Sequence, residues 1–145
     1  METFQFSGVL MGSWEVSPKW VGFDSNVKYI VYKPESGLYI VRHGVYLKKN
    51  EHYFTVYQLS ASAEREEVFR FGGKRKGSWH LPPPCFKGEK ETFYTVYEEN
   101  NLYTIFCEEV KIGKEERIFS IHKFSSRTEA TDSEIGKMLP LAVFV

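Results

Sequence analysis

Net charge is the first thing that this chain lacks. It carries 19 Lys and Arg against 19 Asp and Glu over 145 residues, so its formal net charge is zero. A surface that binds nucleic acid normally leaves a positive excess. The one basic run, residues 74–76 (KRK), is therefore interpreted as a solvated loop tip, and no nucleic-acid partner is expected.

Cysteines and long apolar runs are also scarce. The only cysteines are Cys85 and Cys107, which excludes a disulfide framework; one bridge and two free thiols are both compatible with the sequence. No apolar stretch reaches the roughly 18 residues that a membrane helix needs, so no membrane span is expected. The first residues lack the basic start of a signal peptide. Whether Met1 is the natural start or replaces a removed signal stays open.

Metal-binding and catalytic motifs are absent too. No Cys-x-x-Cys or His-x-x-x-His spacing occurs, so no metal and no cofactor are expected. Cys107 and His122 are the one candidate nucleophile and base on neighbouring strands, and we interpret them as packing on an outer face. The sequence therefore favours binding over catalysis. The histidines are scattered along the chain, at His43, His52, His80 and His122.

Aromatic residues are abundant, at 17% of the chain. Together with many Val and Ile they form a strand-forming composition. Alternation with period 2 predicts a series of strands separated by short polar turns, as in antiparallel hairpins. The predicted strands cover residues 13–20, 26–33, 38–49, 52–62, 67–73, 91–99, 102–110 and 116–126.

Two segments break this regular series. Residues 74–90 contain three consecutive prolines and are predicted to form a long loop, with a short strand near residues 78–81 as an option. Residues 131–139 begin with Thr131 and place Glu134 three residues on, which is the capping-box pattern of a helix. We therefore predict one domain over residues 1–145: an all-β, eight-stranded antiparallel up-and-down barrel, with one C-terminal helix packed on the outside.

Three local patterns resemble the lipocalin family. The first is "FQFSGVLMGSWEV", with Gly12-x-Trp14, and the second is the turn in "YEENNLYTIFCEE". The third is "FSIHKFSSRTEATDSEI", with Arg127 before the predicted helix. The resemblance implies that Trp14 lies across the closed floor of the barrel with Arg127 packed on it. It also implies a carrier of a small hydrophobic ligand, and an extracellular location.

The match has departures. The second pattern lacks the family's usual Thr-Asp-Tyr, and the link after the first strand is short. The C-terminal cysteine that often forms the family's disulfide is missing as well. An engineered or divergent member is therefore compatible with the sequence.

The resemblance and strand alternation together predict which side chains line the barrel. The set is aromatic with a few polar groups, as in small-molecule pockets. If Arg42 and Lys123 both point inward, they favour an anionic group on the ligand. The candidate ligand-binding residues are Tyr29, Val31, Ile40, Arg42, Tyr57, Phe69, Phe71, Phe93, Thr95, Tyr97, Phe106 and Lys123, with Leu38, Thr55, Thr104 and Ile121 completing the predicted lining.

Two other functions stay open. In one, aromatic side chains fill the barrel, and the loops at its open end bind a protein partner. In the other, the protein is an isomerase that uses the interior as a reaction chamber, for which Tyr29, Tyr57 and Tyr97 are the candidate groups.

Overall fold

The computed structural model describes residues 2–16, 25–46, 48–60, 62, 64–81, 90–111 and 115–125. These residues form an all-β fold of eight antiparallel strands. Each strand pairs with the next one along the chain, and β1 also pairs with β8, so that the sheet closes into a barrel-like ring. The strands are β1 (Glu2–Val16), β2 (Ser25–Lys33), β3 (Leu38–Tyr46), β4 (Glu51–Leu59), β5 (Arg65–Leu81), β6 (Lys90–Glu99), β7 (Leu102–Lys111) and β8 (Glu116–Phe124).

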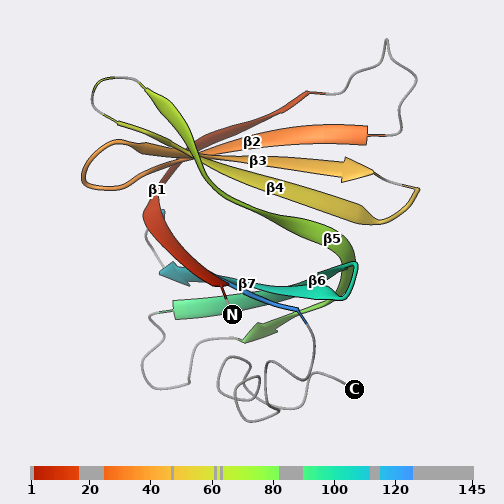
Figure 1. Ribbon diagram of the computed structural model, residues 1–145. Helices are drawn as coiled ribbons and strands as arrows, with labels where there is room; N and C mark the ends of the chain where they lie inside the picture. Colours follow the sequence, from red (N-terminus) through yellow and green to blue (C-terminus); the bar gives the residue numbers. More distant parts are fainter. Residues whose placement is uncertain are drawn as a thin grey trace.

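The ring is flattened into two layers (Figure 1). Strands β2, β3 and β4 form the upper layer, and β6, β7 and β8 form the lower layer. The long strands β1 and β5 curve from one layer to the other. The first half of β1 pairs with β8 and its second half with β2, whereas β5 pairs first with β4 and then with β6.

Irregular residues allow these two strands to bend. The register shifts between Leu10 and Gly12 in β1, and between Arg75 and Gly77 in β5. An extra residue of this kind bends a strand and increases its twist. Gly73 has a φ of 132°, and a Cβ there would collide with the backbone of Glu98. A glycine is therefore required where β5 turns towards β6.

The strand series of the sequence is confirmed for β2, β3, β4, β6, β7 and β8, with shifts of a few residues at the ends. The predicted first strand, residues 13–20, begins too late, because β1 starts at Glu2 and its residues 2–9 pair with β8. The predicted fifth strand was too short, since residues 74–81 continue it. Both errors concern pairings between distant segments, which alternation does not reveal.

The turn between β6 and β7 has the backbone conformation that its two asparagines favour. Asn100 and Asn101 join β6 to β7 with φ values of 48° and 66°, which is the left-handed geometry of a tight hairpin. The β6–β7 turn lies beside the start of β4, because Lys74 of β5 pairs with both Glu51 and Glu98. The predicted helix at residues 131–139 lies outside the described residues, as do Cys85 and Arg127.

Candidate functional site

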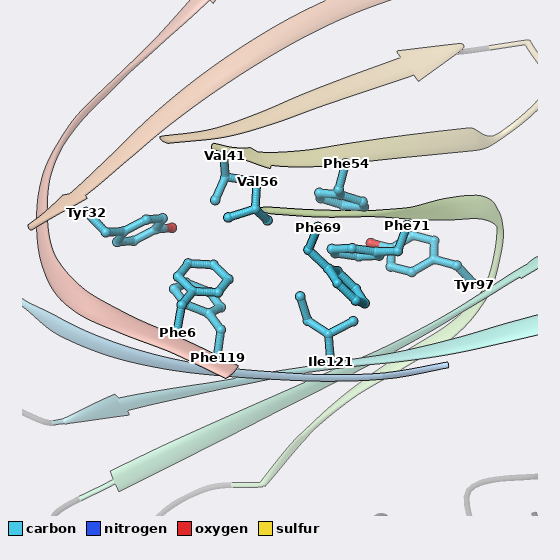
Figure 2. Close-up of a cluster of buried hydrophobic side chains, with 10 residues drawn as sticks. All are labelled: Phe6, Tyr32, Val41, Phe54, Val56, Phe69, Phe71, Tyr97, Phe119 and Ile121. Carbon is cyan, nitrogen blue, oxygen red and sulfur yellow. The ribbon is translucent and has the colours of Figure 1, made fainter. Parts of the chain in front are cut away.

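Aromatic rings project into the space between the two layers (Figure 2). Phe6 stacks on Phe119 with ring centroids 4.5 Å apart, and Phe54 stacks on Phe71 at the same distance. Phe106 joins the two pairs, because its centroid lies 5.5 Å from Phe119 and 5.2 Å from Phe71. We call this set the aromatic core; it comprises Phe6, Tyr32, Val41, Phe54, Val56, Phe69, Phe71, Tyr97, Phe119 and Ile121, with Phe4, Leu10, Ile30, Tyr39, Val68 and Phe106 packed against it.

The prediction for the lower layer and β5 agrees with this core. Phe69, Phe71 and Tyr97 are buried in it, and Phe106 packs against it. Thr95 and Phe93 lie on the same face of β6 as Tyr97, since side chains alternate along a strand. Phe93 remains 37% exposed and stacks on His80 with centroids 4.4 Å apart.

The predicted inner face of the upper layer is inverted. Ile30 and Val41 pack in the aromatic core, so their strand neighbours point outward. The reason is that both faces of these strands are apolar, and a one-residue error in register exchanges them. The side chains that the structure places on the outer face are Tyr29, Val31, Leu38, Ile40, Arg42, Thr55 and Tyr57. Arg42 therefore does not join Lys123 in the interior.

Several core residues were not predicted. Phe6 and Phe119 stack near the middle of the core, and Tyr32 packs edge-on against both rings. The alternation of Phe4 and Phe6 in "TFQF" was the available signal, because it is the pattern of a strand with one buried face. On β4, Phe54 and Val56 carried the same pattern as the predicted Thr55 and Tyr57.

One polar cluster lies inside the barrel beside the aromatic core. Glu108 faces Phe119 across the β7–β8 pair, and the Nε of Arg117 lies 3.4 Å from its Oε1. Burial raises the pKa of Glu108, and Arg117 opposes this effect. The pKa of Tyr32 is raised as well, mainly by burial and to a smaller extent by the negative charge of Glu108. The interior therefore holds a partly desolvated ion pair.

A second polar cluster extends from the core to the β3–β4 connection. The Nε2 of His43 and the Nδ1 of His52 are 3.0 Å apart, and His43 stacks on Phe54 at 4.0 Å. Burial lowers the pKa of His43 to about 4, with smaller effects from His52 and Lys28. His43 is therefore neutral at physiological pH. Asn50 lies at the other side of His52, where its Oδ1 accepts a hydrogen bond from Nε2 at 3.3 Å.

The cysteine and tryptophan that the sequence singled out both lie outside the core. Cys107 is a free, buried thiol on the outer face of β7, and burial raises its pKa to about 11. Trp14 is 49% exposed and stacks on Tyr29 with centroids 5.3 Å apart. Trp14 therefore does not lie across the interior, contrary to the expectation from the resemblance, and its contact with Arg127 stays untested.

Grooves occur on the outer surface. One of about 730 Å³ is lined by Val9, Met11 and Pro34, beside the bend of β1. Another of about 590 Å³ lies over Arg42, Gly44 and Tyr46 on the upper layer. In the part of the chain that the structure describes, no group of three or more His, Cys, Asp or Glu side chains could hold a metal ion. No helix among the described residues is long and apolar enough to cross a membrane.

Comparison with known proteins adds no relative. The chain matches no protein-family profile, no curated protein and no solved structure.

Proposed function

We propose that this protein is a lipocalin-like binding protein that holds a small apolar ligand against the aromatic core. The observation that carries the proposal is that some core-facing rings remain partly exposed. Phe4, Tyr39 and Phe106 pack against the aromatic core, but their side chains are only partly buried. A ligand that covers such rings gains about 25 cal/mol per Å² of apolar surface removed from water. A closed sheet also provides a surface that costs little reorganisation.

The link to lipocalins rests on topology and on the local patterns. Eight antiparallel strands in sequential order support it. The position of Trp14 does not support it, because this residue lies near the end of β1 and faces outward. The extracellular location depends on the same resemblance and is part of the proposal. Binding is favoured over catalysis because Tyr29 and Tyr57 lie on the outer face, and because burial raises the pKa of Tyr97 to about 12, so that its phenol stays protonated at neutral pH.

A titration with the neutral fluorescent probe 1-aminoanthracene tests ligand binding. We expect saturable binding of one probe per chain, and weaker binding in Phe106→Ala because that ring would form part of the contact. Tyr29→Ala is the control, since Tyr29 lies on the outer face, and it should leave the affinity unchanged. If the core has no room, the wild type should not bind, and Phe106→Ala should instead create a site. That result would contradict the proposal.

A second candidate function is the binding of another protein on the outside of the barrel. The observation in its favour is an exposed apolar stripe on β1, where Val9, Met11, Trp14 and Val16 are 44–59% exposed. The zero net charge gives two copies no reason to repel each other, so we take a second copy as the partner. Sedimentation velocity over a concentration series should show a dimer that Met11→Lys weakens. A monomer at all concentrations would exclude this candidate.

A further inference from the structure

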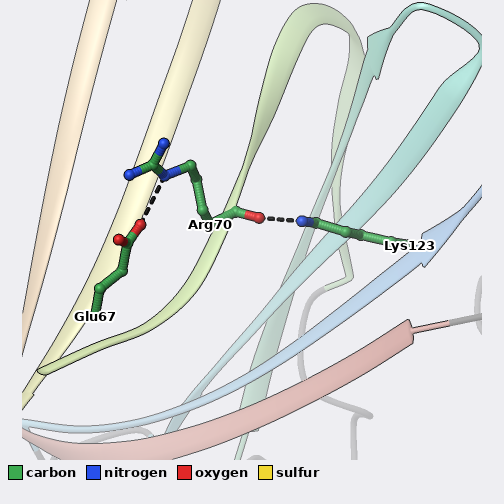
Figure 3. Close-up of polar contacts among 3 residues, drawn as sticks. All are labelled: Glu67, Arg70 and Lys123. Carbon is green, nitrogen blue, oxygen red and sulfur yellow. Dashed lines mark hydrogen bonds and ion pairs between the residues drawn. The ribbon is translucent and has the colours of Figure 1, made fainter.

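Lys123, near the C-terminal end of β8, reaches across the interior to β5 (Figure 3). Its Nζ donates a hydrogen bond to the backbone carbonyl of Arg70 on β5, and it lies 4.5 Å from the centroid of the Phe69 ring. An ammonium group carries three N–H donors, so these two contacts leave capacity for a further acceptor. The cation therefore stands at the edge of the aromatic core.

Thr104 lies next to Lys123 on the inner face. It pairs with Lys123 across β7 and β8 and with Tyr97 across β6 and β7. Its side chain points inward, because its neighbours Tyr103 and Ile105 pack in the outer cluster. Thr104 is 1% exposed, and its Oγ1 has no hydrogen-bond partner among the described residues. A buried hydroxyl without a partner is destabilising, and a ligand group that hydrogen-bonds to it would remove that penalty.

The surroundings favour a singly charged anion with an apolar body. Phe4 is half-buried and stacks on Phe69 with centroids 5.0 Å apart, which offers an apolar face beside the ammonium. Burial lowers the pKa of Lys123, while Glu2 and Glu99 act in the opposite direction. A partly desolvated ammonium gains from a charge-assisted hydrogen bond. The two nearby carboxylates disfavour a doubly charged group such as phosphate.

We propose that Lys123 and Thr104 form a carboxylate subsite, and that the ligand is an apolar carboxylic acid whose hydrocarbon part lies on Phe4 and Phe69. This inference rests on the proposed function and specifies its ligand class. The carboxylate would accept one hydrogen bond from Nζ of Lys123 and one from Oγ1 of Thr104. The existing bond from Lys123 to the Arg70 carbonyl would hold the ammonium in place.

A matched pair of probes tests the subsite. The fluorescent acid 11-(dansylamino)undecanoic acid and its methyl ester differ only in the charged group. We expect the wild type to bind the acid about tenfold more tightly than the ester, which corresponds to about 1.4 kcal/mol. In Lys123→Met the ratio of the two affinities should fall to about one. Thr104→Val, which keeps the shape of the side chain, should lower the ratio about threefold.

Arg70→Gln is the matched control for charge. It also removes one positive charge, but the Arg70 side chain is exposed, lies on the opposite face of β5 and pairs with Glu67 at 2.7 Å. Its acid-to-ester ratio should therefore equal that of the wild type. The ester also reports that each variant is folded, because its affinity should change little in all three.

The possible results separate the two proposals. If the wild type binds neither probe, the proposed function fails. If the wild type binds both probes equally, or if Lys123→Met keeps the preference for the acid, the subsite is wrong while ligand binding stands. A fall of the ratio in Arg70→Gln equal to that in Lys123→Met would also overturn the subsite, because it would show long-range attraction only.

Discussion

The two layers of the barrel differ in what happens to their outer faces. The lower layer buries Val96, Ile105 and Phe124 on its outside, with exposures of 2%, 0% and 3%. The upper layer carries equally apolar side chains on its outside, such as Val31 and Ile40, but leaves them half-buried. Apolar residues on a sheet therefore do not reveal which face is the core. We therefore expect the buried outer face of the lower layer to contribute to stability, whereas the half-buried outer face of the upper layer is available for contacts.

The largest effect should come from deleting residues 131–145. The sequence predicts a helix at residues 131–139 on the outside of the strands that hold Ile105 and Phe124. If that prediction is correct, the deletion exposes the outer cluster of the lower layer, lowers the melting temperature and promotes aggregation. Thermal unfolding and light scattering measure both effects. Unchanged melting and solubility would show that the segment does not cover this face.

Replacing one isoleucine on the outer face of each layer compares the two layers directly. Ile105→Ala should destabilise the protein by about 2–5 kcal/mol, because it leaves a cavity at a fully buried position. Ile40→Ala on the half-buried outer face of the upper layer should cost about 1 kcal/mol or less. Urea unfolding of both variants provides the measurement. Equal losses would remove the distinction between the two outer faces.

Two groups on opposite layers, His43 and Glu108, should make stability depend on pH in opposite directions. Because the pKa of His43 is lowered to about 4 in the folded state, the unfolded chain binds more protons below about pH 6.5, and stability falls as the pH drops towards 4. His52 and His122 act in the same direction. The raised pKa of Glu108 has the opposite sign, since stability then falls as the pH rises above the ordinary value of a carboxyl group.

His43→Phe tests the upper-layer contribution. The loss of unfolding free energy between pH 7 and pH 5 should be smaller in this variant than in the wild type, by on the order of 1 kcal/mol. Urea unfolding at both pH values measures the difference. Glu108→Gln should change the slope in the opposite sense, and an identical slope in all three proteins would contradict both assignments.

The smallest effect is expected at the Trp14–Tyr29 pair, where β1 meets β2. Trp14 and Tyr29 stack at 5.3 Å on the outer face, and such pairs contribute about 0.5–1.5 kcal/mol. Because Trp14 is 49% exposed, we expect the lower end of that range. A double-mutant cycle with Trp14→Ser and Tyr29→Ser measures the coupling. A coupling above about 2 kcal/mol would mean that this pair belongs to a buried contact.

Most of the strand order could be predicted from local sequence, and part of the candidate site could not. Phe69 and Phe71 on β5 alternate with charged or exposed neighbours such as Arg70. Alternation alone therefore predicted that the two phenylalanines point inward. On β2 the run "YIVY" is apolar at every position, and alternation alone could not choose between Tyr29 and Ile30. The polar pairs Glu108–Arg117 and His43–His52 each join two separate strands. The local sequence around these residues contains no pattern that predicts the pairing.

The sequence by itself determined an antiparallel all-β chain, because alternation and turn residues such as Asn100 and Asn101 act over a few residues. Only the tertiary structure decided which face of each strand is the interior. It also brought Lys123 across to the carbonyl of Arg70 and left Thr104 sealed beside it. The physical reason is that these properties depend on closing the sheet through the β1–β8 pair, which joins the two ends of the strand series.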